Sequence, residues 1–373
     1  FFPFELVEGM DVDTEINQRL NEAEQNKQRM RSQSQHSINN EDVDKKEETE
    51  ESQLNSARDE IISYLQNTHV SDLKFAAKAV VLDSKLNPKK AIETLLKYKI
   101  RAAPVIDGNQ FIGVLGLRDL VPYALESYHL HKEAQLKQIN EEKQEENKEA
   151  KSHLLTHEKL QQLTLPQLCK HRPFKYVKDD DTLYKVAQLF ASGSHVIGVI
   201  NSKGKQNELI GVITQGYFFR ESIGKKWKFE HNCLLAEILK LKYITSPVMS
   251  INKAMKAHDA FKTMVEKQLT GLAVVDDDGV LIHNTSASDV KLWLLSSNTL
   301  EDTIEQFLIA VRNLSLVERF PVTTCGLHDS LKRAVQMMTA TKYHRLWIAN
   351  EERQPIGVFA ITDVFQFICK SKE

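Results

Sequence analysis

The stretch Arg101–Asp119, RAAPVIDGNQFIGVLGLRD, holds two short runs of β-forming residues around the polar turn Asp107-Gly108-Asn109. This pattern predicts a β-hairpin, because glycine and short polar residues are favoured in tight turns. An arginine precedes the first expected strand and an aspartate follows the second. The predicted hairpin is therefore bracketed by a cation and a carboxylate.

The same pattern recurs along the chain. Gly271–Asp289, GLAVVDDDGVLIHNTSASD, and Arg345–Asp363, RLWIANEERQPIGVFAITD, have the same length and the same terminal aspartate. A looser copy, Val196–Tyr217, VIGVINSKGKQNELIGVITQGY, has a longer turn and ends in tyrosine. Helical patterns flank the hairpins. We therefore predict four repeats, each made of a short strand, a helix, two strands around a turn, and a second helix.

The helix that precedes the first hairpin has the clearest start. Asn87 is expected to be its N-cap and Pro88 its first residue. Its apolar face would carry Ala91, Ile92, Leu95 and Leu96. A unit of this size leaves one sheet face apolar and uncovered, so each repeat is expected to pair with a neighbour.

The composition is typical of a soluble globular protein, with 373 residues, 41% hydrophobic and 27% charged. A net charge of −2 gives no whole-chain attraction to nucleic acid. The four cysteines form no C-x-x-C pair, which favours a reducing, intracellular compartment over a zinc or redox site. No apolar run reaches roughly 18 residues, so no membrane span is expected. We predict a soluble, cytoplasmic protein, and attachment to a cytoskeletal or ciliary assembly stays open.

Two polar stretches divide the chain. Residues 25–54 have almost no apolar side chains and are expected to be disordered. Residues 129–155 are rich in Glu, Lys, Gln and Ala and are expected to be helical. The predicted domains are a docking segment (1–24), a disordered linker (25–54), repeat 1 (55–128), a charged helical insertion (129–155), repeat 2 (156–228), repeat 3 (229–299) and repeat 4 (300–373).

The first 24 residues carry a thin apolar stripe, Val12, Ile16 and Leu20, behind the aromatic opening FFPFEL. This stripe suits docking either on the chain's own repeats or on a partner. The opening does not have the pattern of a signal peptide. Since no initiator Met is present, further residues are expected to precede Phe1.

Several motifs resemble a known family. KIRAAPVID is followed by IGVLGLRD, GLAVVDDDG by SASDV, and YHRLWIA by GVFAITDVF. Over roughly Glu60 to Lys372 the chain resembles four-repeat cystathionine β-synthase (CBS) domain proteins, and among them the gamma, nucleotide-sensing subunits of AMP-activated protein kinase. The resemblance implies an α/β (α+β) fold in which four repeats form two CBS-pair modules, assembled as a disc around a central cleft.

In the resembling family, the carboxylate after each hairpin accepts the ribose hydroxyls of an adenine nucleotide. A carboxylate suits this task because its two oxygens can accept two donors. By motif position the ribose-binding residues would be Asp119, Asp289, Asp363 and Ser286. The alternative is that each aspartate only stabilises a helix N-terminus, by about 0.3 to 1 kcal/mol. Gly116 and Ala360 replace the usual hydroxyl in two repeats and lower the expected affinity there.

The cation before each hairpin meets phosphates in the resembling family, a task that arginine can perform with two parallel hydrogen bonds. By motif position the phosphate-binding residues would be Arg101, His195, His344 and Arg345. The alternatives are solvated arginines and half-buried, satisfied histidines. The second repeat has Tyr217 in place of the carboxylate and Val196 in place of the arginine. We expect one empty site and two or three occupied ones.

Other chemistries find little support in the sequence. VVDDDG lacks the ligand spacing of a calcium loop, and a hairpin turn explains its composition. There is no phosphate-binding G-x-x-x-x-G-K-[ST], no H-E-x-x-H and no G-x-S-x-G. We predict no catalytic residue, no metal site and no required cofactor.

The sequence thus predicts a non-enzymatic regulatory subunit that binds AMP, ADP or ATP and modulates a protein partner such as a kinase. Two alternatives remain. One is a scaffold protein with degenerate sites inside a larger assembly, and the other is a sensor of an adenosyl ligand such as S-adenosylmethionine. The partner and the preferred nucleotide stay undecided.

Overall fold

The computed structural model describes residues 54–75, 79–141, 163–203, 208–226, 235, 244–290, 299–315 and 322–369. The chain divides into two compact units, Phe1–Ser56 and Ala57–Glu373, and all four repeats fall in the second. The predicted docking segment, and the predicted linker except for its last residue, lie outside the described residues.

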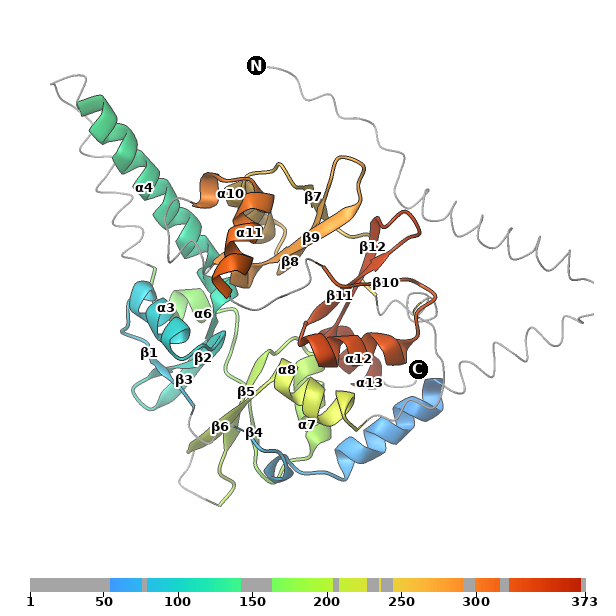
Figure 1. Cartoon of the computed structure of the whole chain (residues 1–373). Helices are drawn as coiled ribbons and strands as arrows, with labels where there is room; N and C mark the ends of the chain where they lie inside the picture. The colour runs from blue at the N-terminus through green and yellow to red at the C-terminus, as the bar shows by residue number, and fades with distance from the viewer. Residues whose placement is uncertain are drawn as a thin grey trace, which may run out of the picture. The chain divides into compact units, whose positions relative to one another are not determined.

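Four three-stranded sheets form the framework of the second unit (Figure 1). In each sheet the short first strand pairs in parallel with the second, which pairs antiparallel with the third. The strands are β1 (Leu82–Asp83), β2 (Ala102–Asp107) and β3 (Gln110–Gly116); β4 (Tyr176–Lys178), β5 (Val196–Ile200) and β6 (Leu209–Thr214); β7 (Ser250–Asn252), β8 (Gly271–Val275) and β9 (Leu281–Ser286); and β10 (Thr324–Cys325), β11 (Arg345–Ala349) and β12 (Pro355–Ala360). The predicted mixed α/β fold of four repeats is confirmed.

Helices and short helical turns flank the hairpins in the described residues. They are α3 (Pro88–Lys97), α4 (Val121–Glu141), α6 (Leu165–Cys169), α7 (Leu183–Ala191), α8 (Gln215–Phe218), α10 (Ala257–Glu266), α11 (Ile304–Ser315), α12 (Leu331–Thr341) and α13 (Ile361–Cys369), with short helical turns η1 (Val70–Asp72), η2 (Leu117–Leu120), η3 (Phe219–Gly224) and η5 (Thr299–Glu301). Helix α3 starts as predicted, because Asn87 Oδ1 accepts the Lys90 N–H at 2.8 Å and Pro88 is the first helical residue.

Glycine shapes the hairpin turns. Gly108, between β2 and β3, has a φ of +56°, in the left-handed region that side chains disfavour. Gly279 has a φ of +79° in the turn after β8. There the Asp276 carboxylate accepts the N–H groups of Asp278 and Val280 at 3.1 and 2.9 Å. The first aspartate of VVDDDG therefore stabilises a turn.

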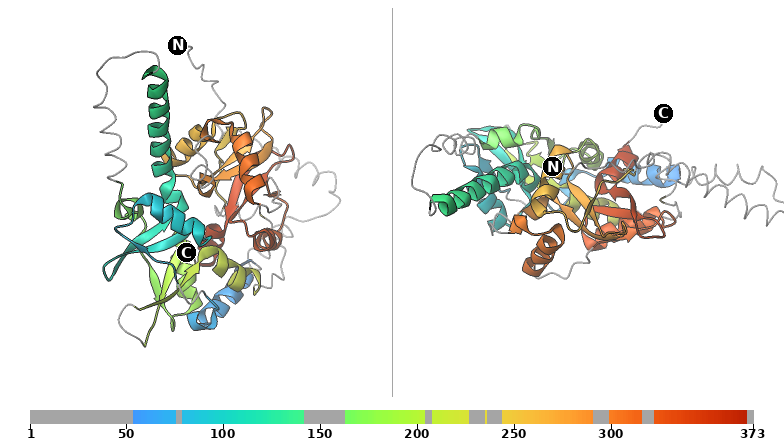
Figure 2. Two further views of the ribbon diagram at one scale, coloured as in Figure 1. Left: turned by 60° about the vertical axis from the view of Figure 1, so that its left-hand side comes forward. Right: turned by 90° about the horizontal axis from the view of Figure 1, so that it is seen from above.

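Helix α4 continues across residue 128, which was the predicted boundary between repeat 1 and the charged helical insertion. It begins directly after η2 and continues to Glu141, because no glycine or proline interrupts its hydrogen bonds after the first turn. Its later turns extend away from the sheet of repeat 1 (Figure 2). Residues 142–155 of the predicted insertion lie outside the described part of the chain.

Repeats 1 and 2 exchange the segments that lead into them. The Val70 N–H donates to the Asp181 carbonyl and the Leu183 N–H donates to the Thr68 carbonyl, each at 2.9 Å, so the segment before repeat 1 lies against repeat 2. In return, α6 packs on β3 and buries Leu165 in the core of repeat 1. The exchange holds the two repeats together as one pair.

Repeats 3 and 4 are joined in the same way. The Ala257 N–H donates to the Asp302 carbonyl at 2.9 Å, which ties the segment before repeat 4 to repeat 3. The Leu235 N–H donates to the Asp329 carbonyl at 2.9 Å, which ties the segment before repeat 3 to repeat 4. The predicted domain boundaries, which treated each repeat as a continuous stretch, stay predictions.

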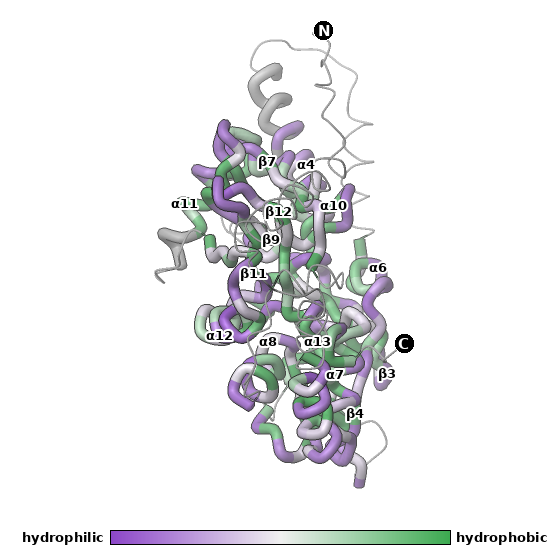
Figure 3. The backbone as a smooth tube through the Cα atoms, turned by 90° about the vertical axis from the view of Figure 1, so that its right-hand side faces the viewer, coloured by the Kyte–Doolittle hydropathy of each residue, from purple (hydrophilic) through white to green (hydrophobic). Residues whose placement is uncertain are grey.

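Helices connect the two pairs. Helix α4 of repeat 1 packs on α10 and α11, where Tyr128, Phe261 and Phe307 share one buried core with residues of repeat 3. Helix α13 of repeat 4 packs on α7 of repeat 2. Hydrophobic residues colour much of α13 in Figure 3, as expected for a helix buried between repeats.

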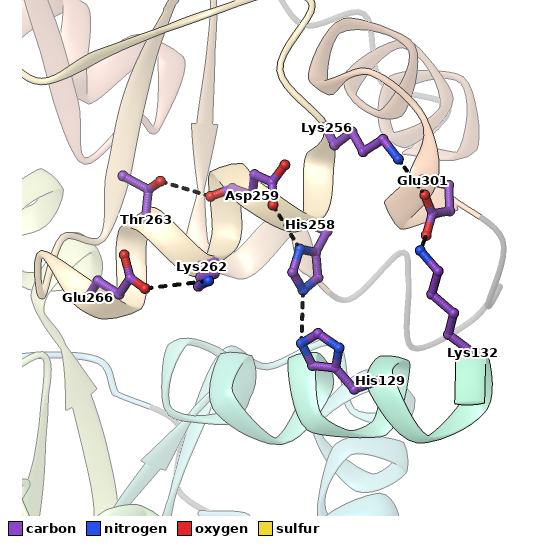
Figure 4. Close-up of polar contacts among 9 residues, drawn as sticks. All are labelled: His129, Lys132, Lys256, His258, Asp259, Lys262, Thr263, Glu266 and Glu301. Carbon is purple, nitrogen blue, oxygen red and sulfur yellow. Dashed lines mark hydrogen bonds and ion pairs between the residues drawn. The ribbon is translucent and has the colours of Figure 1, made fainter. Parts of the chain in front are cut away.

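Polar contacts line the edge of the contact between repeats 1 and 3 (Figure 4). His129 Nε2 and His258 Nε2 lie 3.2 Å apart, and Asp259 Oδ1 lies 3.0 Å from His258 Nδ1. Glu301 accepts Lys132 Nζ at 2.7 Å. Exposed polar pairs of this kind add little stability, so the apolar core accounts for most of the stability of the contact between α4 and repeat 3.

Within the described ranges, no helix combines the length and the apolar character needed to cross a bilayer.

Candidate functional site

The three predicted carboxylates occupy the same position in their repeats. The Oδ2 atoms of Asp119, Asp289 and Asp363 each accept, at 2.7 Å, the backbone N–H of the residue three positions earlier. This contact caps the helical turn that follows each hairpin. The helix-start role therefore takes one oxygen of each carboxylate and leaves Oδ1 for a second contact, which in Asp119 is made by Arg172.

Ser286 adds a hydroxyl to the third repeat. Its Oγ donates to Asp289 Oδ2 at 3.0 Å and lies 2.8 Å from Ser288 Oγ. The matching positions in repeats 1 and 4 are Gly116 and Ala360, which have no side-chain donor. Of the three carboxylates, Asp289 alone has a neighbouring hydroxyl at this position.

Arg345 lies at the start of β11 and reaches into repeat 3. Its Nη2 donates to Thr270 Oγ1 at 2.8 Å and to the Thr270 carbonyl at 3.3 Å. Gly271 permits this position, because a Cβ there would overlap the guanidinium. The charges of Asp289 and Asp363 both act on Arg345 and oppose the effect of burial, which lowers its pKa. Arg345 therefore lies within the electrostatic reach of both carboxylates.

His195 joins three repeats through a chain of hydrogen bonds. Arg118 Nη1 lies 2.9 Å from His195 Nε2, and Gln215 Oε1 lies 2.9 Å from His195 Nδ1. Since arginine can only donate, Nε2 must accept and Nδ1 must carry the proton. Gln215 Nε2 then donates to Thr362 Oγ1 at 3.0 Å, next to Asp363.

His344 completes a cluster of basic residues. Its Nε2 lies 3.5 Å from Arg101 Nη1, and it packs against Gly216, where a Cβ would lie 2.8 Å from the same nitrogen. The charges of Arg101, Arg345 and Arg220 all act on its pKa. The basic cluster consists of Arg101, Arg118, His195, Arg220, His344 and Arg345. The structure thus brings together all four predicted phosphate-binding residues.

Both histidines in the basic cluster are neutral at pH 7. Burial, followed by the charge of Arg118, lowers the pKa of His195 to about 4. Burial, followed by the charge of Arg101, lowers the pKa of His344 to about 3. Burial likewise lowers the pKa of Arg118 and of Arg345. The positive charge therefore resides on arginines whose mutual repulsion a bound anion would relieve.

The carboxylates differ in their surroundings. Burial raises the pKa of Asp363 to about 6. Burial raises the pKa of Asp119 to about 7, against the opposing effects of the Gly116 N–H and of Arg118. Asp119 Oδ1 also lies 2.8 Å from Arg172 Nε, and this ion pair favours the ionised carboxylate. In the second repeat, the Tyr217 hydroxyl donates to the Lys74 carbonyl.

Four residues of this region were not predicted. Arg118 directly precedes Asp119, and Gln215 lies two positions before Tyr217, so their positions in the repeat could have drawn notice. Arg172 and Arg220 lie outside the motif stretches and carry no such signal. A cavity of about 240 Å³ opens beside Cys325 and Asn350 near the opposite end of β11, and none of the predicted site residues lines it.

The repeats match the CBS domain family over residues 70–126, 169–224, 238–296 and 311–370. The chain belongs to the CBS-domain family. The resemblance inferred from the hairpin motifs is confirmed. Each of the four matched segments contains one of the four hairpins.

Several curated relatives of this CBS-domain chain come from fungi. It is 28% identical over 194 residues to Protein SDS23 of Candida albicans, covering 49% of the chain and 30% of that protein. It is 26% identical over 251 residues to Protein sds23 of Neosartorya fischeri, covering 64% and 45%, and 24% identical over 315 residues to Protein SDS23 of Saccharomyces cerevisiae, covering 78% and 57%. The chain thus spans about a third to somewhat over half of the length of these relatives.

A solved structure from Methanocaldococcus jannaschii, described as a proposed archaeal homolog of g-AMPK, superposes with a TM-score of 0.58. The match covers 80% of this chain and 98% of that one at 18% identity. At this identity the match shows that the two chains share the four-repeat fold.

Proposed function

We propose that this CBS-domain protein is a regulatory subunit that binds AMP, ADP or ATP and passes the identity of the nucleotide to a protein partner. One observation carries the proposal: arginines from three repeats converge, and one of them, Arg345, lies within electrostatic reach of two carboxylates. A cluster of arginines within electrostatic reach of carboxylates that can accept hydroxyl donors suits a ligand with a phosphate at one end and a diol at the other.

The ribose would be held by Asp289 and Asp363. Each uses Oδ2 to cap its helix, so Oδ1 can accept a ribose hydroxyl. The phosphates would extend toward Arg345 and its neighbours in the basic cluster. The choice of adenine as the base rests on the family resemblance.

Regulation would follow from phosphate number. AMP, ADP and ATP bring different charges to the same arginines, so each would neutralise the basic cluster to a different degree. A nucleotide shifts the partner's equilibrium only by its difference in affinity for the two states of the complex. Reciprocity then requires that the partner change nucleotide affinity by the same factor. A kinase of the type implied by the resemblance is the partner we favour.

Titration calorimetry of the full chain with AMP, ADP and ATP tests the proposal, beside the double variant Asp289→Ala, Asp363→Ala. Each substitution removes hydrogen bonds to a charged acceptor, which predicts a loss of about tenfold to a hundredfold at its site. Asp329→Ala is a matched control, since that carboxylate likewise accepts the backbone N–H of the residue three positions earlier, Gly326, but in the turn before α12. Absence of binding up to millimolar nucleotide by a folded protein would reject the proposal.

A scaffold role is the second candidate. The observation that favours it is the contact between Tyr217 and the Lys74 carbonyl, which gives the second repeat an internal partner in place of a ligand. The missing hydroxyls at Gly116 and Ala360 point the same way. Failure to bind any nucleotide, with the fold intact, would favour this function within a larger assembly.

AMP affinity at the Asp363 site is expected to fall by about tenfold between pH 7 and pH 5. The pKa of Asp363 is raised to about 6, so only about one tenth of the carboxylate stays ionised at pH 5. His195 and His344, with pKa values of about 4 and 3, remain neutral throughout this range. Calorimetry in buffers from pH 5 to 8 measures the change.

The AMP phosphate itself titrates near pH 6. Asp363→Asn therefore provides the control for the pH experiment, because it retains the phosphate effect and lacks the carboxylate. Parallel profiles for the wild type and this variant would contradict the role assigned to Asp363.

A further inference from the structure

Arg172 is anchored by its backbone beside the third strand of repeat 1. Its N–H donates to the Cys169 carbonyl at 2.8 Å, and its carbonyl accepts the Val114 N–H at 3.0 Å. Gly113 permits this approach, because a Cβ there would lie 2.7 Å from Cys169 Sγ and 3.1 Å from the Arg172 carbonyl oxygen. The segment that repeat 2 lends to repeat 1 therefore fixes Arg172 next to the first carboxylate site.

The side chain of Arg172 contacts the second carboxylate oxygen of Asp119. Oδ2 accepts the Gly116 N–H at 2.7 Å, and Oδ1 lies 2.8 Å from Arg172 Nε. The Asp119 side chain is only 11% exposed, and the Arg172 side chain is 19% exposed. Both oxygens of the carboxylate are thus engaged inside the protein, on the face where a ribose would have to bind.

A neutral diol competes poorly for such a carboxylate. Both donors would make a charge-assisted hydrogen bond to the carboxylate, but the guanidinium adds the attraction of its own positive charge, which a neutral hydroxyl lacks. Displacing Arg172 would also leave a largely buried cation without its partner, which is strongly unfavourable. A ribose would therefore have to break a stronger contact than the ones that it makes.

In the second repeat, the residue at the carboxylate position also contacts another part of the protein. Its Tyr217, in the position of the carboxylate, donates its hydroxyl to the Lys74 carbonyl, in the segment that repeat 1 lends to repeat 2. In both repeats of this pair, a residue of the exchanged segment thus contacts the ribose position.

The carboxylates of repeats 3 and 4 have no such ion pair in the described residues. In the part of the chain that the structure describes, no lysine, arginine or histidine lies within ion-pair distance of Asp289 or Asp363. We propose that Arg172 is a built-in occupant of the first carboxylate site, so that the chain binds nucleotide at repeats 3 and 4 only. The proposal rests on the proposed function for its ligand, and it reduces the expected two or three occupied sites to two.

Equilibrium dialysis of the full chain with labelled AMP tests this by counting bound molecules at pH 8. Burial raises the pKa of Asp119 to about 7 while Arg172 is present, so pH 8 keeps this carboxyl ionised in the wild type. Because loss of the arginine raises this pKa further, the Arg172→Ala variant is also counted at pH 9. The wild type and Asp119→Asn should each bind two AMP. Asp289→Asn and Asp363→Asn should each bind one fewer. Arg172→Ala should bind three, and Arg172→Ala with Asp119→Asn should bind two again.

Arg333→Ala is the matched control, since this exposed arginine pairs with Asp329 at 3.3 Å and should leave the count at two. A loss of one AMP from Asp119→Asn would overturn the proposal, and so would a folded Arg172→Ala that gains none. If Arg172→Ala does not fold, the comparison of Asp119→Asn with the wild type decides alone.

Failure of the proposed function gives a different result. A wild type that binds no AMP, beside an Arg172→Ala variant that binds one, would reject nucleotide binding at repeats 3 and 4 and support the role of Arg172. Absence of AMP from both proteins would overturn both proposals.

Discussion

Arg345→Met is expected to weaken AMP binding by about a hundredfold or more while the nucleotide-free protein stays folded. Truncating one partner of a desolvated charge pair costs about 2 to 5 kcal/mol of binding free energy. Arg345 is the cation proposed to meet the phosphate, and the charges of Asp289 and Asp363 both act on it. Methionine fills much of the arginine volume. It also removes the cost of burying the guanidinium, the largest effect on Arg345, which opposes the loss of its hydrogen bonds to Thr270 and of its attraction to the two carboxylates. Calorimetry gives the affinity and a thermal melt gives Tm.

Arg333→Met provides the control, because Arg333 lies in the same repeat and is exposed. It should bind AMP as the wild type does. An Arg345→Met variant with unchanged AMP affinity would show that the basic cluster does not hold phosphate. Binding of S-adenosylmethionine that survives Arg345→Met, beside lost AMP binding, would show that the ribose sites work without the cation. Such a result would also keep the adenosyl-sensor alternative open.

Phe365→Ala is expected to lower the free energy of unfolding by about 3 to 5 kcal/mol. The Phe365 ring is fully buried and lies 5.5 Å from Phe190, 5.6 Å from Phe218 and 6.3 Å from Phe219, measured between ring centroids. These three rings belong to repeat 2, so the substitution opens a cavity where repeats 2 and 4 meet. Urea unfolding, with the midpoint and slope compared to wild type, measures the loss.

The same variant should reduce AMP affinity, because Asp363 lies two positions earlier in α13 and depends on that helix for its placement. Tyr98→Ala is the control, since this aromatic side chain is 54% exposed and its loss should change stability by less than about 0.5 kcal/mol. Similar losses for Phe365→Ala and Tyr98→Ala would contradict the packing described for α13.

Local signals were enough to predict the repeated unit. The Asn87 cap and the left-handed Gly108 turn each depend on a few adjacent residues, so their chemistry can be read directly from the chain. The recurrence of one hairpin pattern predicted four repeats, and the terminal aspartate in three of them predicted their candidate ribose sites. It also predicted that Tyr217 would make the second repeat different.

The sequence by itself therefore determined the four repeats, the CBS fold and the residue types at each candidate site. Tertiary structure alone decided which of those residues meet. Arg101 and His344 are 243 positions apart, and their contact depends on how the two pairs of repeats pack. The pairing of Arg172 with Asp119 likewise depends on the exchange of leading segments, for which no local pattern exists, because the hydrogen bonds that hold it are between backbone groups. Backbone hydrogen bonds can form between almost any residue types, so the sequence does not indicate where they form. The charges around each carboxylate depend on side chains that long-range packing brings together.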